Sequence, residues 1–209
     1  MKKVILLLLI SLVLVGQAYS KPAFGLRLGL NSANATHGPE ESNISSDSKT
    51  GIILGGALEV AINKKANRTI RFEAAYVQKG FRNLYAQGVG ISGTAEVDEF
   101  VFTPAVIFRL SDAKTIPYLL VGADVGFTTK SKALIPVGNL LIEGDIPDWE
   151  GTDVSLDLGA GLLFPSGEGE FLTELRFSIG MTDMYPGDDW DPTTNNVEFI
   201  LGYNFTVPK

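Results

Sequence analysis

The segment FGLRLGLN, at residues 24–31, alternates strictly between apolar side chains and side chains that are small or polar. Neighbouring side chains of a β-strand point to opposite faces of the strand. An extended chain here therefore places four apolar side chains on one face: Phe24, Leu26, Leu28 and Leu30. The segment predicts a strand whose two faces meet different surroundings.

Seven later segments repeat this alternation, which gives eight in total, and in all of them the apolar face carries no charged residue. No run of 18 apolar residues occurs after the N-terminal region, so the sequence excludes transmembrane helices. An all-β fold is predicted. The seven segments span residues 51–62, 70–79, 99–110, 118–127, 154–164, 171–180 and 197–206.

The connections between these segments alternate between long and short. Long connections occupy residues 33–50, 81–95, 128–152 and 181–196. Short ones occupy residues 63–67, 111–116 and 165–169. Outer-membrane barrels have long extracellular loops and short periplasmic turns. The sequence therefore predicts an eight-stranded antiparallel up-and-down transmembrane β-barrel.

The N-terminal region has the order of a secretory signal peptide. Lys2 and Lys3 form a positive start, and an apolar run follows at residues 4–15. The small residues Ala18 and Ser20 then precede a predicted cleavage site directly after Ser20. Twelve apolar residues are too few for a helix that crosses a bilayer.

Cleavage would leave residues 21–209 as one outer-membrane barrel domain and remove residues 1–20 as the signal peptide. The remaining 15 basic and 24 acidic residues give a formal charge of −9, which does not suit nucleic-acid binding. The chain has no cysteine, so it can form neither a disulfide nor a thiol-linked lipid anchor. The predicted location is the bacterial outer membrane, where the folded surface of a monomer holds the protein.

The direction of the apolar face distinguishes a membrane barrel from a soluble carrier, because a lipocalin-like barrel points this face inward. A water-facing surface would be about a quarter to a third charged. Here the polar face is mostly glycine, alanine and serine. Small side chains suit the narrow interior of an eight-stranded barrel, so the apolar face is predicted to contact lipid.

The polar face also carries charges of both signs. In a lumen such charges are tolerated when they form a hydrogen-bonded network. We expect this network to hold the barrel together rather than to catalyse a reaction. Its predicted members are Arg27, Glu59, Arg71, Glu73, Arg109, Asp124, Asp157, Glu174, Arg176 and Glu198.

Pro104 lies in the middle of a predicted strand, on the lipid face. Proline has no N–H to donate to a neighbouring strand. We therefore expect a bulge or locally frayed pairing at this position.

Several stretches resemble the outer-membrane β-barrel family that includes OmpX-like and PorT-like proteins. The resemblance covers most of the chain after residue 20, although each motif is short, and it implies a fold and a location rather than a catalytic site. The stretches are EAAYVQKG (73–80), PYLLVG (117–122), DLGAG (157–161), ELRFSIGMT (174–182) and LGYNF (201–205).

The closing stretch looks like the terminal signal that the barrel assembly machinery reads. In this resemblance Gly202 is followed by aromatic residues at alternate positions, Tyr203 and Phe205. Four residues, 206–209, follow Phe205, so it is not the C-terminal residue as in the family pattern.

His37 is the only histidine and lies near Ser32, Thr36 and Glu40, a combination that could support a lipid-modifying surface enzyme. The sequence spacing does not show that these groups converge, and a solvated loop histidine is the simpler reading.

Two other predicted loops have unusual compositions. Residues 134–149 are apolar for a loop in water, and they could fold over the barrel mouth or form a short hairpin. The last loop is acidic and lacks the spacing of a dedicated calcium loop. It is a candidate for weak divalent-cation binding through Asp183, Asp188, Asp189 and Asp191.

The leading hypothesis is a non-enzymatic outer-membrane barrel with a structural or surface-interaction role through its extracellular loops. One alternative is the binding or transport of a small solute through the lumen. Another is a lipid-modifying enzyme that uses His37. The expected partners are outer-membrane lipid, lipopolysaccharide and the barrel assembly machinery, and no cofactor or dedicated metal site is predicted.

Overall fold

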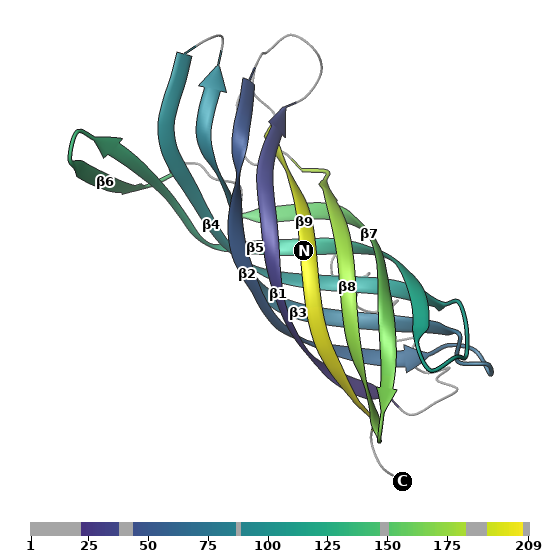
Figure 1. The fold of residues 1–209 in the computed structure, drawn as a ribbon. Helices are drawn as coiled ribbons and strands as arrows, with labels where there is room; N and C mark the ends of the chain where they lie inside the picture. The colour runs from purple at the N-terminus through teal and green to yellow at the C-terminus, as the bar shows by residue number, and fades with distance from the viewer. Residues whose placement is uncertain (1–21, 38–43, 87–88, 147–150, 183–191, 207–209) are drawn as a thin grey trace.

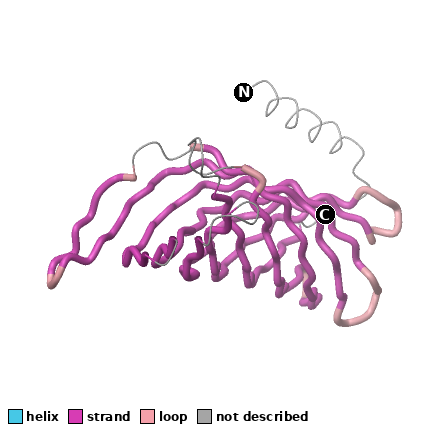
Figure 2. Tube along the Cα trace, turned by 90° about the horizontal axis from the view of Figure 1, so that it is seen from above, coloured by secondary structure: helices cyan, strands magenta, loops and turns pink. Residues whose placement is uncertain are grey.

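The fold of the chain was analysed in a computed structural model, which describes residues 22–37, 44–86, 89–146, 151–182 and 192–206. These residues form strands and loops (Figure 2), and among them no helix is long and apolar enough to cross a membrane. The nine strands of the described residues are β1 (Ala23–His37), β2 (Ile44–Ala61), β3 (Arg68–Ala86), β4 (Val89–Arg109), β5 (Ile116–Val137), β6 (Leu140–Asp145), β7 (Thr152–Ser166), β8 (Gly169–Gly180) and β9 (Pro192–Thr206).

Eight of these strands close a barrel, as the sequence predicts. Their order is β4-β3-β2-β1-β9-β8-β7-β5, every pairing is antiparallel, and β4 pairs with β5 to complete the wall (Figure 1). The ninth strand, β6, pairs with the far part of β5 and lies outside the closed wall.

The apolar side chains of the wall point outward. Leu26 is 63% exposed, Leu54 59% and Leu158 44%, whereas the neighbouring Arg27 is 1% exposed. A soluble carrier would show the opposite arrangement, with its apolar side chains inside the barrel. The predicted orientation of the apolar face toward the outside is therefore confirmed, and the interior holds the charged groups together with a smaller set of apolar side chains that includes Ile53, Leu120 and Ile200.

Short turns join the strands at one end of the barrel, which we call the turn end. They lie at residues 62–67, 110–115 and 167–168, close to the predicted positions. In the first, the Ala66 N–H donates to the Asn63 carbonyl at 3.0 Å, and Ala66 has a φ of 52°. Gly167 adopts a φ of 59° in the third, a conformation that glycine accepts without steric cost.

At the opposite end, which we call the ribbon end, the strands are longer than the alternation predicts. β1 continues to His37, β3 and β4 form a hairpin up to residues 86 and 89, and β5 runs to Val137. The predicted boundaries of the loops at 33–50, 81–95, 128–152 and 181–196 were therefore wrong. Beyond a lipid belt both faces of a ribbon meet water, so the backbone can stay paired without alternating side chains.

Pro104 interrupts one side of its strand. On β3 it is paired with Phe72, but between β4 and β5 the pairing stops after Phe102 and resumes at Ala105 in the same register. The predicted frayed pairing is confirmed and no register shift occurs there. The Thr103 hydroxyl donates to Asp124 Oδ1 across the gap.

Candidate functional site

The inner wall of the barrel is the most distinctive polar region of the molecule. The register of neighbouring strands places opposite charges side by side: Glu59 lies opposite Arg71, and Arg176 lies opposite Glu198. Because alternate residues of each strand point inward, the strands together line the narrow lumen with charged side chains.

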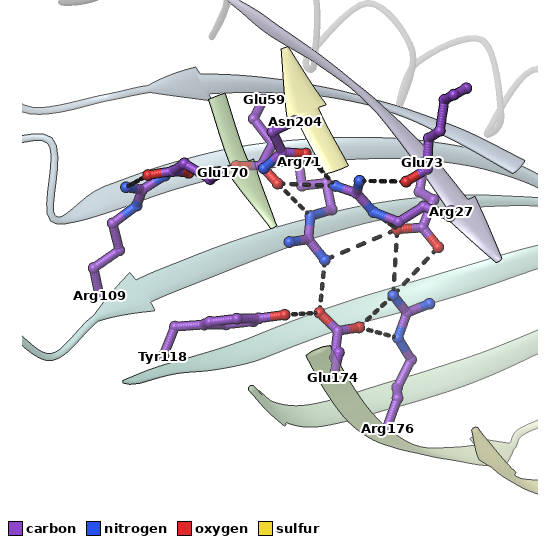
Figure 3. Close-up of polar contacts among 11 residues, drawn as sticks. Arg27, Glu59, Arg71, Glu73, Arg109, Tyr118, Glu170, Glu174, Arg176 and Asn204 are labelled. Atoms are coloured by element: carbon purple, nitrogen blue, oxygen red, sulfur yellow. Dashed lines mark hydrogen bonds and ion pairs between the residues drawn. The ribbon is translucent and has the colours of Figure 1, made fainter. Parts of the chain in front are cut away.

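Three arginines and three glutamates form the centre of this set (Figure 3). Arg71 is the hub, with Nε 2.8 Å from Glu59 Oε1 and Nη1 2.7 Å from Glu174 Oε2. We call this group, with the tyrosine beside it, the arginine cluster. Its members are Arg27, Glu59, Arg71, Glu73, Glu174, Arg176 and Tyr118.

Of the other contacts of the arginine cluster, Arg176–Glu73 joins β8 to β3 across the lumen, whereas Arg176–Glu174 lies within β8 and Arg27–Glu59 joins the neighbouring strands β1 and β2. Arg176 Nη2 is 2.7 Å from Glu174 Oε1 and 3.3 Å from Glu73 Oε1, and Arg27 Nη2 is 3.1 Å from Glu59 Oε1. The charges balance, three positive against three negative, so the cluster meets the requirement that buried ions be paired and hydrogen-bonded.

Aromatic and neutral groups complete the cluster. The Tyr118 hydroxyl donates to Glu174 Oε2 at 2.6 Å, and the Arg71 guanidinium carbon lies 5.7 Å from the centre of the Tyr118 ring. Arg27 Nη2 also donates to Asn204 Oδ1 at 2.8 Å. Asn204 and Tyr118 were not predicted as members of the network, because neither side chain is charged at neutral pH.

Glycines on the wall make room for these large side chains. A Cβ on Gly161 would lie 2.5 Å from Tyr118 Cζ, and one on Gly25 would lie 2.4 Å from Arg27 Nη1. Such distances are far below normal contact, so the small residues on the polar face are a steric requirement of the filled lumen.

A further ion pair closes the turn end. Arg109 donates to both carboxylate oxygens of Glu170, at 2.8 and 2.9 Å, in a bidentate arrangement. Glu170 was missed from sequence because it directly follows a predicted turn, where an acidic residue is ordinarily solvated.

Lys79 occupies the lumen near the ribbon end. Its Nζ lies 2.8 Å from Glu99 Oε2 and 2.9 Å from Asp153 Oδ2, and the lysine side chain is 1% exposed. Asp153 also accepts from the Thr182 and Thr194 hydroxyls, at 2.9 and 3.2 Å. Asp153 was not predicted because the sequence placed it at the edge of a loop.

Besides Arg109, three predicted members of the network lie outside the arginine cluster: Asp124, Asp157 and Glu198. Arg176 Nη1 is 3.6 Å from Glu198 Oε2 and 3.9 Å from Asp157 Oδ2, so both contacts are longer than the central ones. Asp124 is bonded to Thr103. The structure therefore places the ten predicted residues in one lumen but in distinct groups.

The closing strand carries the residues of the predicted assembly signal. The ring of Tyr203 packs edge-on against two other rings. Its centroid lies 4.6 Å from that of Phe171 and 4.7 Å from that of Phe205. Gly202 lies opposite Arg27. These positions are those of an aromatic girdle, and the reading by the assembly machinery stays a prediction.

The candidate enzyme and cation groups are not assembled within the described residues. His37 is the last residue of β1, and an extended strand separates its backbone from that of Ser32 by roughly 16 Å. Glu40 lies outside the described residues. So do the four aspartates of the predicted cation loop, Asp183, Asp188, Asp189 and Asp191.

The apolar segment that was predicted either to fold over the barrel mouth or to form a short hairpin forms a hairpin. Residues 132–137 of β5 pair with Leu140–Asp145 of β6. We call this unit the β5–β6 hairpin. It projects sideways from the ribbon end (Figure 1). Its apolar side chains are exposed: Ile135 43%, Val137 51%, Leu140 72%, Leu141 65% and Ile142 53%.

Comparison with known proteins supports the fold. No protein-family model and no curated protein matches this sequence. The solved structures similar to it include outer membrane protein OprG of Pseudomonas aeruginosa, at 10% identity and a TM-score of 0.54, over 92% of this chain and 99% of that chain.

Two further structures resemble the chain more distantly. Neisserial surface protein A is 14% identical with a TM-score of 0.47, over 88% of this chain and 97% of that chain. Ail, the attachment invasion locus protein of Yersinia pestis, is 16% identical with a TM-score of 0.43, over 90% and 99%. The likeness to OprG, over almost the whole of both chains, shows that this chain has the fold of an outer-membrane β-barrel.

Proposed function

We propose that the chain is an integral outer-membrane protein with a closed lumen, and that it acts at the cell surface through the β5–β6 hairpin. The apolar belt supports insertion into a bilayer, since Leu26, Leu28 and Leu54 are each more than half exposed. Orientation follows from the fold, because outer-membrane barrels keep short turns in the periplasm. The ribbon end is then extracellular.

The filled lumen argues against a role as a general porin. Arg27, Arg71 and Tyr118 are among the largest fully buried side chains, and all three lie within the barrel. An eight-stranded barrel is just wide enough for side chains to fill. A continuous water channel would require the arginine cluster to break.

The exposed apolar surface of the β5–β6 hairpin is the main support for a role at the cell surface. Leu140 and Leu141, on opposite faces of β6, are 72% and 65% exposed, so the described residues cover neither face of the hairpin. Contiguous apolar surface of this kind marks contact sites for proteins or membranes. Within the described part of the chain, β6 also has no strand on its outer edge, so an extended partner segment can add a strand there.

Charged groups flank the apolar tip of the hairpin. Lys132 donates to Glu143 across the two strands, and Lys130 Nζ lies 2.8 Å from Glu96 Oε2 at the base. This arrangement fits a protein partner, because interfaces combine an apolar centre with a polar rim. A partner protein at the surface is therefore the proposed ligand of the hairpin.

The proposal is tested in the native cell with a photo-crosslinking amino acid at Val137. We expect discrete cross-linked products that disappear when Leu140→Ser and Leu141→Ser are introduced together. The matched control carries the same probe at Lys114, in a turn at the opposite end of the barrel, and its products should not change with the hairpin substitutions. Heat-modifiable gel migration verifies that the variant barrel is folded. Products at Val137 that persist in the double variant contradict the proposal.

A further inference from the structure

The lumen holds more acidic than basic side chains, and the excess lies toward the ribbon end. Among the described residues of the inner wall, four basic side chains are fully buried, Arg27, Arg71, Lys79 and Arg176. The arginine cluster accounts for the three arginines and three glutamates. Lys79 is left with five buried carboxylates: Glu99, Asp124, Asp153, Asp157 and Glu198.

Asp157 is the carboxylate with the weakest compensation. Its side chain is 0% exposed, and neither oxygen has a hydrogen-bond partner among the described residues. The nearest ion-pair contact, from Arg176 Nη1, is 3.9 Å away, and Arg176 is already bound to Glu174 at 2.7 Å. An ionised carboxylate buried in this way requires a neutralising group.

Neutral polar side chains lie beside Asp157 on the inner wall. Ser178 lies directly opposite Asp157 on β8, and Asn196 lies opposite Ser178 on β9. Ser155 is the next inward residue before Asp157. All three are at most 2% exposed, and none of their side-chain polar atoms has a hydrogen-bond partner among the described residues.

Asp124 supplies a second carboxylate from the adjoining strand. Gly122 is the register partner of Asp157, so Asp124 is its diagonal neighbour across the β5–β7 pair. Diagonal neighbours on one face remain within reach of each other's side chains. One oxygen of Asp124 accepts from Thr103.

We infer that Asp124 and Asp157, with Ser155, Ser178 and Asn196, bind a hard divalent cation, for which Ca²⁺ is the best fit. Calcium takes six to eight oxygen ligands in flexible geometry and accepts carboxylate, amide and water oxygens together. Water alone would satisfy the hydrogen bonds but not the charge. The site is distinct from the proposed contact surface on the β5–β6 hairpin.

The composition of the site indicates modest affinity. Within the described ranges, no group of three or more histidine, cysteine or acidic side chains is arranged to hold a metal ion. Two carboxylates and three neutral oxygens therefore form the protein part of the shell, and water completes it. We expect a dissociation constant of order 10⁻⁴–10⁻³ M, as in extracellular calcium modules.

The test uses the full-length mature protein, refolded in detergent and freed of divalent ions, with CaCl₂ added in a calorimeter. Wild type should bind one Ca²⁺ per barrel in a saturable manner. The variant Asp157→Asn keeps the shape and removes one charge, so its affinity should fall about tenfold or more. Asp112→Asn, an exposed acid in a turn at the far end of the barrel, is the matched control and should bind as wild type does.

Two results would overturn the inference. One is the absence of saturable binding to wild type, together with an infrared C=O band of a buried carboxylic acid that Asp157→Asn removes, since a shared proton then neutralises the pair. The other is binding that Asp157→Asn leaves intact but Asp188→Asn with Asp189→Asn abolishes. If Asp157→Asn does not fold on the heat-modifiable gel, Asn196→Ala carries the test, because it removes a ligand oxygen without a change of charge.

Discussion

Arg71 Nη1 lies 2.7 Å from Glu174 Oε2, and this ion pair joins β3 to β8 across the interior of the barrel. Three strands, β2, β1 and β9, separate β3 from β8 along the wall. The contact is therefore a tie through the lumen rather than a link between neighbours. Together with the other members of the arginine cluster, it fastens opposite sides of the cylinder to each other.

Glu174→Gln should strongly destabilise the barrel. Removal of one partner leaves Arg71 and Arg176 buried with less compensation, a change that typically costs about 3–5 kcal/mol. The free energy of unfolding is measured by a urea titration in which heat-modifiable gel migration reports the folded fraction. The exposed Glu143→Gln, which breaks a surface pair with Lys132, should show no measurable change. Equal stabilities of the two variants would contradict a structural role for the cluster.

Gly161→Ala should destabilise the protein through steric overlap. The added Cβ would lie 2.4 Å from the backbone oxygen of Thr173 and 2.5 Å from Tyr118, so the wall or the ring must move. Overpacking of this kind costs roughly 1–3 kcal/mol. Gly144→Ala in β6 is the control, because a Cβ there meets no atom within 4 Å. The same unfolding assay compares the two variants.

Wild-type protein in a planar bilayer should carry no steady ion current, since the arginine cluster and Tyr118 fill the lumen. Tyr118→Ala removes the ring while it leaves the arginine–glutamate pairs, so we expect intermittent openings. Tyr76→Ala, on the outer face of β3, should remain closed. A steady wild-type current would instead favour the transport of a small solute through the lumen.

The Glu96–Lys130 pair on the ribbons should respond to acid. The hydrogen bond from Lys130, 2.8 Å long, lowers the pKa of Glu96 below its ordinary value. A lowered pKa in the folded state means that the pair contributes stability above the ordinary pKa and loses it as the pH falls through the lowered one. Both side chains are about a third exposed, so the effect is local. An NMR titration should show the pKa of Glu96 rising toward its ordinary value in Lys130→Gln, and an unchanged pKa would rule the pair out as the cause.

The wall of the barrel could be predicted from sequence because lipid and lumen impose opposite demands on alternate residues. Leu26 and Arg27 illustrate this, since they are neighbours with 63% and 1% exposure. The strands beyond the belt, such as residues 33–37 of β1 and 128–137 of β5, lack that constraint, so their alternation fades although their pairing continues.

The partners inside the lumen were beyond sequence reasoning for a different reason. Which inward residues meet depends on the tilt and stagger of the closed barrel. Arg71 and Glu174 are 103 positions apart, and no local pattern joins them. Neutral participants such as Asn204 carried no charge signal, and Glu170 lay beside a turn, so the sequence could supply candidates for the network without their pairings.

The gap beside Pro104 divides the β4–β5 pairing into two separate stretches. At Thr103 and Pro104 the two strands are joined by the side-chain hydrogen bond from Thr103 to Asp124 instead of by backbone pairing. The β4–β5 interface therefore has fewer backbone pairs over this stretch than the β3–β4 interface on the other side of Pro104, and we expect the wall to separate most readily there.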